Sequence, residues 1–170
     1  MIKISNKTLD DLEFKTVLEQ IAELCNTDLG RTKALTIEPF KKENLLLDAL
    51  HQVNEYKSSE LQDAKIPNHG FESIDKELQL LNIENTFLET SSFKKLTSIS
   101  TTTNELLFFF KKYAEIYPTL YKKTEEVEFT KFIIESIDKI IDRFGEVKND
   151  ASPLLQRLRN DINIVQGKLN

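Results

Sequence analysis

The feature that most constrains this chain is the spacing of its apolar residues, which recur at intervals of three and four along most of the sequence. Only four glycines and four prolines interrupt the 170 residues, so the segments between them are long enough for helices of several turns. Intervals of three and four place apolar side chains on one face of an α-helix, whereas strands place them at intervals of two. The sequence therefore predicts an all-α protein, a multi-helix bundle.

Capping residues and breakers give approximate limits to these helices. Thr8 and Asp11 resemble a capping box, Ser73 can cap a short helix, and Pro118 and Gly145 are expected stops. The expected helices span about 8–25, a short stretch between Asn26 or Thr27 and Pro39, 44–57, a short stretch after Ser73, 90–117, 127–144 and from 153 onward. Residues 66–70 are expected to form a turn, because a proline and a glycine lie within them.

The last of these helices carries a regular apolar seam. Ser152 followed by Pro153 is a strong helix start, since serine accepts from free amides and proline fits the first turn. Beyond it the apolar residues alternate in steps of three and four, which is the spacing of a coiled-coil seam. No stop signal precedes Asn170, so we expect the chain to be truncated within a longer helix. The seam residues are Leu155, Leu158, Ile162, Val165 and Leu169.

Composition limits the classes of function. Lys and Arg total 23 against 28 Asp and Glu, a net charge of −5, so a self-sufficient nucleic-acid binder with a basic surface is not expected. The single cysteine, Cys25, excludes an internal disulfide framework. The start is charged too early for a signal peptide, and no apolar run approaches the roughly 20 residues that span a bilayer. We expect a cytoplasmic protein without a membrane partner.

Candidate catalytic groups have simpler explanations. His51 and Glu55 lie four residues apart on one helix face, but a metal site needs further ligands and none is nearby in sequence. Acidic residues recur every fourth position from Asp138 to Asp150, which is more typical of a solvated face than of an acid–base pair. The phosphate-binding pattern GxxxxGK[ST] is absent. We therefore assign no catalytic, metal or cofactor residue to this chain.

Two stretches carry a resemblance to a known family. One lies near the start and the other runs into the seam helix, and their order and spacing agree with the family over nearly the whole chain. The first stretch comprises Leu12-Glu13-Phe14, Ile21-Ala22, Cys25-Asn26-Thr27, Gly30-Arg31, Pro39 and Glu55, and the second comprises Asp138, Ile141-Asp142, 145–152, Leu155, Leu158-Arg159 and Ile162. With these residues the chain resembles the bacterial MutS-two family, the paralogues of mismatch-repair MutS.

The resemblance implies a mechanical part of a larger machine. Residues 1–150 would form a core or lever region, with a subdivision near 58–72, and residues 151–170 would begin a coiled-coil clamp helix. The parent would be a dimeric ATPase using ATP and Mg, in many members with a nuclease domain, that binds branched or mismatched DNA and in some members stalled ribosomes. The fragment itself would be non-catalytic, and its partners would be the remainder of the polypeptide and a second subunit.

Several residues are candidates for this mechanical role. Gly145, Asp150, Ser152 and Pro153 would form a hinge, with an ordinary turn as the alternative. Leu107 and Phe108 would form an interface unless that helix is internal. Arg157 and Arg159 are candidate phosphate contacts. A different class of function, a free-standing helical interaction or dimerisation module using the seam, also fits the sequence.

Overall fold

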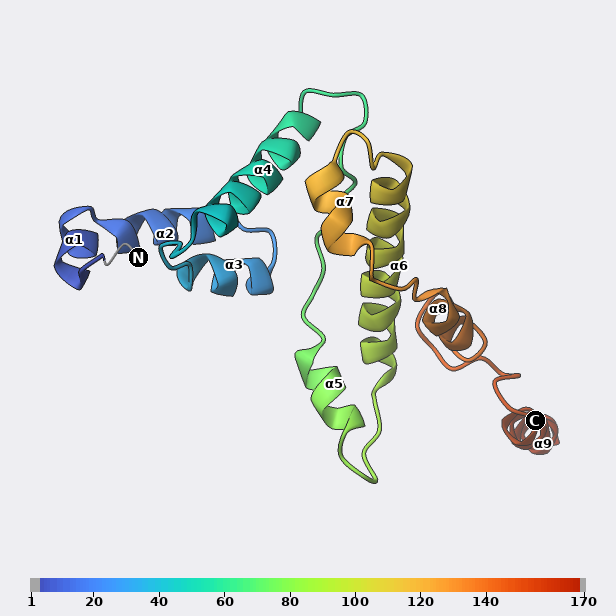
Figure 1. Cartoon of the computed structure of the whole chain (residues 1–170). Helices are drawn as coiled ribbons and strands as arrows, with labels where there is room; N and C mark the ends of the chain where they lie inside the picture. The colour runs from blue at the N-terminus through green and yellow to red at the C-terminus, as the bar shows by residue number, and fades with distance from the viewer. Residues whose placement is uncertain (1–3, 169–170) are drawn as a thin grey trace. The chain divides into compact units, whose positions relative to one another are not determined.

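Helices make up the secondary structure, as the spacing of three and four predicts. The computed structural model describes residues 4–168. Within them it contains nine α-helices and no strand beyond an isolated bridge between Ile141 and Val147, so the all-α prediction is confirmed (Figure 1). None of these described helices is long and apolar enough to cross a membrane. The helices are α1 (Asn6–Asp11), α2 (Phe14–Glu23), α3 (Asp28–Leu35), α4 (Glu43–Ser59), α5 (Asp75–Leu81), α6 (Thr90–Lys112), α7 (Pro118–Thr124), α8 (Lys131–Asp138) and α9 (Pro153–Gly167).

The chain divides into two units, and neither is continuous in sequence. The first comprises residues up to 73 together with 102–129, and the second comprises residues 74–101 together with those from 130 onward. The long helix α6 therefore contributes its first turns to the second unit and its remaining turns to the first. The expected division into a core region over 1–150 and a clamp helix over 151–170 concerns function, and it stays a prediction.

Tyr117 lies at the centre of the first unit's core. Its side chain is fully buried, and its hydroxyl donates to the Ala64 carbonyl at 2.5 Å, with Gln62 Oε1 at 3.3 Å. The hydroxyl is thereby satisfied, because a buried polar group without a partner is costly. Its neighbours are apolar and aromatic residues of α6, the turn after α6, α7 and the segment after α4. They are Ala64, Ile66, Leu106, Phe109, Phe110, Tyr113, Leu120 and Tyr121.

Polar contacts join α4 to α7 in the same unit. The carboxylate of Glu55 accepts from two amides of the first turn of α7, those of Thr119 at 2.8 Å and Leu120 at 2.9 Å. First-turn amides have no partner within their own helix, so an acidic side chain is a favourable acceptor for them. Two turns earlier on α4, Asp48 forms an ion pair with Lys123 at 2.9 Å. Glu55 thus serves as a cap supplied by another helix.

The prediction of a single N-terminal helix over 8–25 is wrong, because the structure has two helices there, α1 and α2. Glu13 adopts a left-handed conformation with φ of 50°, which separates α1 from α2. The cap of α1 is Ser5, whose hydroxyl accepts from the Thr8 amide, so Thr8 is not the cap. The apolar stripe that suggested one helix belongs to α2. Thr27, one of the two expected caps, does cap α3 by accepting from Gly30 at 3.0 Å.

Later boundaries also differ from the sequence expectations. α5 begins at Asp75 with Ile74 in the cap position, in place of Ser73. The helix expected over 90–117 ends at Lys112, since the chain then turns to bring Tyr117 into the core. The helix expected over 127–144 is reduced to α8 at Lys131–Asp138. The residues after α8 form the turn described below.

Candidate functional site at the joint between α8 and α9

Three of the four expected hinge residues, Gly145, Asp150 and Ser152, lie in the segment 139–152, which we call the joint. The fourth, Pro153, is the first residue of α9. The joint begins as a short antiparallel turn: the Asp142 amide donates to the Glu146 carbonyl at 2.9 Å, and the Lys148 amide donates to the Ile140 carbonyl at 2.8 Å. Ile141 and Val147 pair between them as an isolated bridge, and Ile141 is buried. The joint therefore has its own hydrogen-bonded structure.

Asp142 organises the tip of this turn. Its Oδ1 accepts from the amides of Phe144 at 2.8 Å and Glu146 at 2.9 Å, while the Gly145 amide donates to the Asp142 carbonyl at 2.9 Å. The hydrogen bond from the Glu146 amide is the main cause that lowers the pKa of the Asp142 carboxyl below its ordinary value. Asp142 therefore remains ionised and holds the turn at neutral pH.

Gly145 is required by the turn for two reasons. Its φ is +85°, a left-handed conformation that glycine adopts without steric cost. It is also buried beneath α6, where an added Cβ would lie 1.9 Å from Cε of Lys94. The expectation that Gly145 caps the preceding helix is thus wrong, because α8 ends at Asp138 and the glycine belongs to the tip of the turn.

The base of α9 is tied back to the joint. Ser152 caps α9 by accepting from the Leu155 amide at 3.2 Å, and Pro153 occupies the first turn, as the sequence predicts. From the second turn, Nη1 of Arg159 donates to the Val147 carbonyl at 3.1 Å and to Oδ1 of Asn149. The direction in which α9 leaves the joint is therefore held by a cap and by a guanidinium bridge.

A further contact links the joint to α8. The ammonium of Lys148 donates to the main-chain carbonyl of Asp138, the last residue of α8. Helix C-termini leave carbonyls without an intrahelical donor, and a lysine is a suitable partner for them. Arg159 and Lys148 together bind the joint to the helices that precede and follow it.

The remaining predicted residues are placed as follows. Asp150 lies exposed in the joint, and Arg157 is exposed on α9 without a side-chain hydrogen bond to any residue in the described range. Leu107 and Phe108 belong to the part of α6 in the first unit, whereas the joint belongs to the second. Leu107 is 6% exposed and Phe108 is 64% exposed. The roles proposed for these residues stay predictions.

The seam is visible as an exposed apolar surface of α9. Leu158, Ile162 and Val165 are between 50% and 57% exposed, and Leu155, nearer the joint, is half-buried. Leu169 lies outside the described residues. α9 ends at Gly167 with Lys168 as its cap, although Gly167 was not expected to mark a boundary.

Sequence reasoning assigned no role in the joint to three side chains whose hydrogen bonds hold it: Asp142, Lys148 and Asn149. Asp142 was interpreted as part of a solvated acidic face, yet an Asp followed three residues later by Gly is a typical turn signature. No local signal could have found the Arg159 contacts with Val147 and Asn149, because they join residues ten or more positions apart.

The two side chains considered as metal ligands, His51 and Glu55, do not form a metal site in the described structure. Both carboxylate oxygens of Glu55 cap α7, as described above, and His51 is exposed. Both ring nitrogens of His69 are within hydrogen-bond distance of a partner: Nε2 lies 3.3 Å from Tyr56 Oη, and Nδ1 lies 3.1 Å from the Pro67 carbonyl. Among residues 4–168, no group of three or more His, Cys, Asp or Glu side chains is placed to hold a metal ion.

No protein-family model matches the chain. Curated proteins named endonuclease MutS2 do match it: that of Halothermothrix orenii is 22% identical over 180 residues and covers 98% of this chain. The MutS2 of Bacillus velezensis is 25% identical over 169 residues, and that of Pelotomaculum thermopropionicum is 24% identical over 166 residues, each again covering 98% of the chain. The chain is related to the MutS2 proteins.

The family resemblance inferred from the sequence is thereby confirmed. Because the MutS2 match covers 98% of the chain, the joint lies within the related stretch. The chain spans about a fifth of the length of these relatives, 21–22% in the three named above.

Proposed function

We propose that this chain is the N-terminal core and lever segment of a MutS2-like ATPase, and that it carries no catalytic site. In this proposal the joint transmits nucleotide-driven movement of the motor to a coiled-coil clamp that begins with α9. The motor, its ATP and Mg, a nuclease domain and the second subunit of a homodimer would be supplied by the rest of the protein. The whole protein would be cytoplasmic and would act on branched or mismatched DNA in recombination and repair. Stalled ribosomes would be a second substrate.

The observation that carries this proposal is the bridge from Arg159 to the joint. A helix joined to its neighbour by a flexible linker, without other contacts, would change direction freely and would transmit little movement. Arg159 instead bonds two positions of the joint, and Ser152 caps the helix start. A lever helix needs such a fixed start, because a rotation of the joint then moves the far end of α9 as well.

The exposed seam supports the same proposal. Leu158, Ile162 and Val165 leave half or more of their surface open to water, and burying the remaining surface of each is favourable by about 1–1.5 kcal/mol, half of the value for a fully exposed side chain. In the proposed machine they pack against further residues of the clamp. The related proteins called endonuclease MutS2 are several times longer than this chain, which leaves ample length for that clamp.

The first test is the coding sequence beyond Asn170. The lever proposal expects apolar residues to continue in steps of three and four, followed at a distance by GxxxxGK[ST], whose amides hold nucleotide phosphates. A stop codon close to Asn170 would refute it.

The second test compares two arginines in the full-length protein. We expect Arg159→Ala to reduce the stimulation of ATP hydrolysis by branched DNA about tenfold while leaving basal hydrolysis intact, because transmission through the joint is lost. Arg157→Ala, the matched control two residues away, should behave like the wild type. Equal loss in both variants would instead indicate phosphate contacts, and no loss in Arg159→Ala would contradict the lever.

A free-standing interaction or dimerisation module is the second candidate, because it also accounts for the exposed seam. It predicts that the 170-residue chain dimerises and that Ile162→Asp abolishes the dimer. Sedimentation equilibrium over a range of protein concentrations measures both. A monomer at all concentrations would exclude this candidate.

A further inference from the structure

A cavity of about 390 Å³ lies between the first turns of α6 and the turn of the joint, within the second unit. The chain as a whole is acidic, with a net charge of −5. The lining of this cavity nevertheless has more cationic than anionic side chains: Lys94, Arg143 and Lys148 against Asp138 and Asp142. A local excess of positive charge in an acidic protein favours an anionic ligand at that place.

One acidic group and one cationic group of the lining are already engaged in hydrogen bonds. Asp142 Oδ1 accepts from two amides of the turn, and the Lys148 ammonium donates to the main-chain carbonyl of Asp138. Lys94 and Arg143 differ, since neither makes a side-chain hydrogen bond or ion pair with another residue of the range 4–168. The guanidinium of Arg143 lies over the ring of Phe144, 4.7 Å from its centroid.

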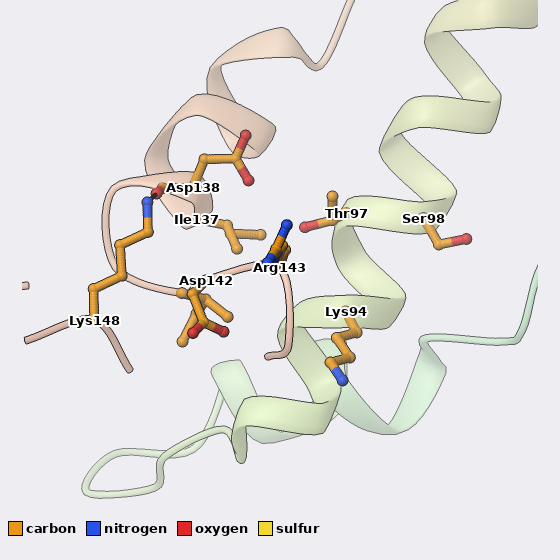
Figure 2. A pocket seen from close by; sticks show the side chains of 9 residues that line it. Lys94, Thr97, Ser98, Ile137, Asp138, Asp142, Arg143 and Lys148 are labelled. Atoms are coloured by element: carbon orange, nitrogen blue, oxygen red, sulfur yellow. Dashed lines mark hydrogen bonds between the residues drawn. The ribbon is translucent and has the colours of Figure 1, made fainter. Parts of the chain in front are cut away.

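The donors that line the cavity come from two elements. Lys94 and Thr97 are three residues apart on α6, so they share one face of the helix. Figure 2 shows the Arg143 guanidinium extending from the turn toward Thr97, whose hydroxyl points back toward it. An ammonium, a guanidinium and a hydroxyl around one hollow are the donors that recognise a phosphate, which accepts charge-assisted hydrogen bonds at several oxygens.

We propose that this cavity binds a phosphate group through Lys94, Thr97 and Arg143. The phosphate is either a small free phosphate or one in the backbone of a nucleic acid, since both present the same oxyanion. A bound phosphate would bridge α6 to the turn of the joint. The proposal is independent of the lever function, because it rests on donors of this chain alone.

The test is a titration of the isotope-labelled 170-residue chain with inorganic phosphate, followed by amide chemical shifts. Sodium chloride at equal ionic strength is the reference, because salt alone screens surface charges. We expect saturable shifts confined to residues 94–98 and 142–148. Linear shifts that match those in chloride would overturn the proposal.

Three variants make the test specific. Lys94→Gln and Arg143→Gln should each weaken the apparent affinity at least about fivefold, because each removes a charged donor. Lys139→Gln is the control, since Lys139 is an exposed cation of the same unit that does not line the cavity, and it should change the affinity less than about twofold. Equal weakening by Lys139→Gln and Lys94→Gln would overturn the proposal, because binding would then reflect net charge. Circular dichroism verifies that each variant is folded.

A second titration, with a short single-stranded oligothymidylate, identifies the source of the phosphate. Tighter binding than inorganic phosphate at the same amides, weakened by Arg143→Gln, would assign the cavity to a nucleic-acid backbone. Binding of inorganic phosphate alone would assign it to a small phosphate ligand. Loss of phosphate binding leaves the Arg159 experiment unaffected, so the two proposals fail separately.

Discussion

Gly145 is the position in the joint where a single methyl group has the largest expected effect. Alanine at this residue must adopt a φ of +85° beneath the Lys94 side chain, and a non-glycine residue in such a conformation costs about 1–3 kcal/mol. Gly145→Ala should therefore lower the free energy of unfolding by that amount in urea titrations. Gly167→Ala is the control, because nothing lies within 4 Å of its added Cβ and alanine favours the helix by about 1 kcal/mol. Effects of the same sign in both variants would contradict this account.

Asp142 makes the stability of the turn in the joint depend on pH in the acidic range. Its carboxyl has a lowered pKa in the folded chain, so the stability that it contributes is present above the ordinary aspartate value of about 3.9 and is lost as the pH falls through the lowered value. The protection of the Phe144 and Glu146 amides against hydrogen exchange, relative to their rates in an unstructured chain, should fall over that acidic range. Asp142→Asn keeps an acceptor oxygen but has no charge to titrate, so its exchange should lack this step. An identical step in the variant would assign it to another carboxyl.

The residue scale also shows how far sequence reasoning reaches. Ser152 and Pro153 were predicted correctly as a helix start, because a cap acts on amides two or three residues away. Gly145 was assigned to a helix end because Phe144 continued the apolar spacing of α8. The spacing of Asp142 and Gly145 instead indicates a turn. The turn forms in place of a longer helix because the Asp142 side chain accepts hydrogen bonds from the amides of Phe144 and Glu146.

At the scale of elements, the junction of α4 and α7 depends on one carboxylate. Glu55→Ala leaves the amides of Thr119 and Leu120 without their acceptor and should cost about 1–3 kcal/mol of unfolding free energy. Glu55→Gln should cost less, since one carbonyl oxygen remains. His51→Ala is the control on the preceding turn of α4 and should stay within about 0.5 kcal/mol, because His51 is exposed. A large effect of His51→Ala would favour a shared role for the two residues, such as metal binding.

Contacts between helices that are far apart in the sequence could not be predicted. Glu55 reaches α7 across 64 residues, and Tyr117 reaches Ala64 across 53. Periodicity gives the existence of a helix and its apolar face, but it does not identify the partner helix. The same reason explains the shortened end of α6, since the turn after Lys112 is set by the burial of Tyr117 and not by a local breaker.

At the scale of the whole molecule, the all-α class followed from the apolar spacing, whereas the two discontinuous units did not. α6 belongs partly to each unit, and an uninterrupted helical pattern gives no sign of such a division. Apolar residues that the sequence treats alike differ in burial. Leu107 and Phe110 of α6 are buried, whereas Leu158, Ile162 and Val165 of the α9 seam are half or more exposed, as are large apolar side chains elsewhere such as Leu61.

A matched pair of leucines tests whether the seam is a surface for partners outside the described chain. Leu107 is 6% exposed and Leu158 is 50% exposed, so the same change to alanine removes very different packing. Leu107→Ala should lower the free energy of unfolding by about 2–4 kcal/mol, and Leu158→Ala by about 1 kcal/mol or less. Urea unfolding followed by circular dichroism measures both. In the longer protein the cost of Leu158→Ala should rise toward that of Leu107→Ala, because the proposed clamp covers the seam. An unchanged cost there would show that the seam stays open to water, and it would remove the clamp from the proposal.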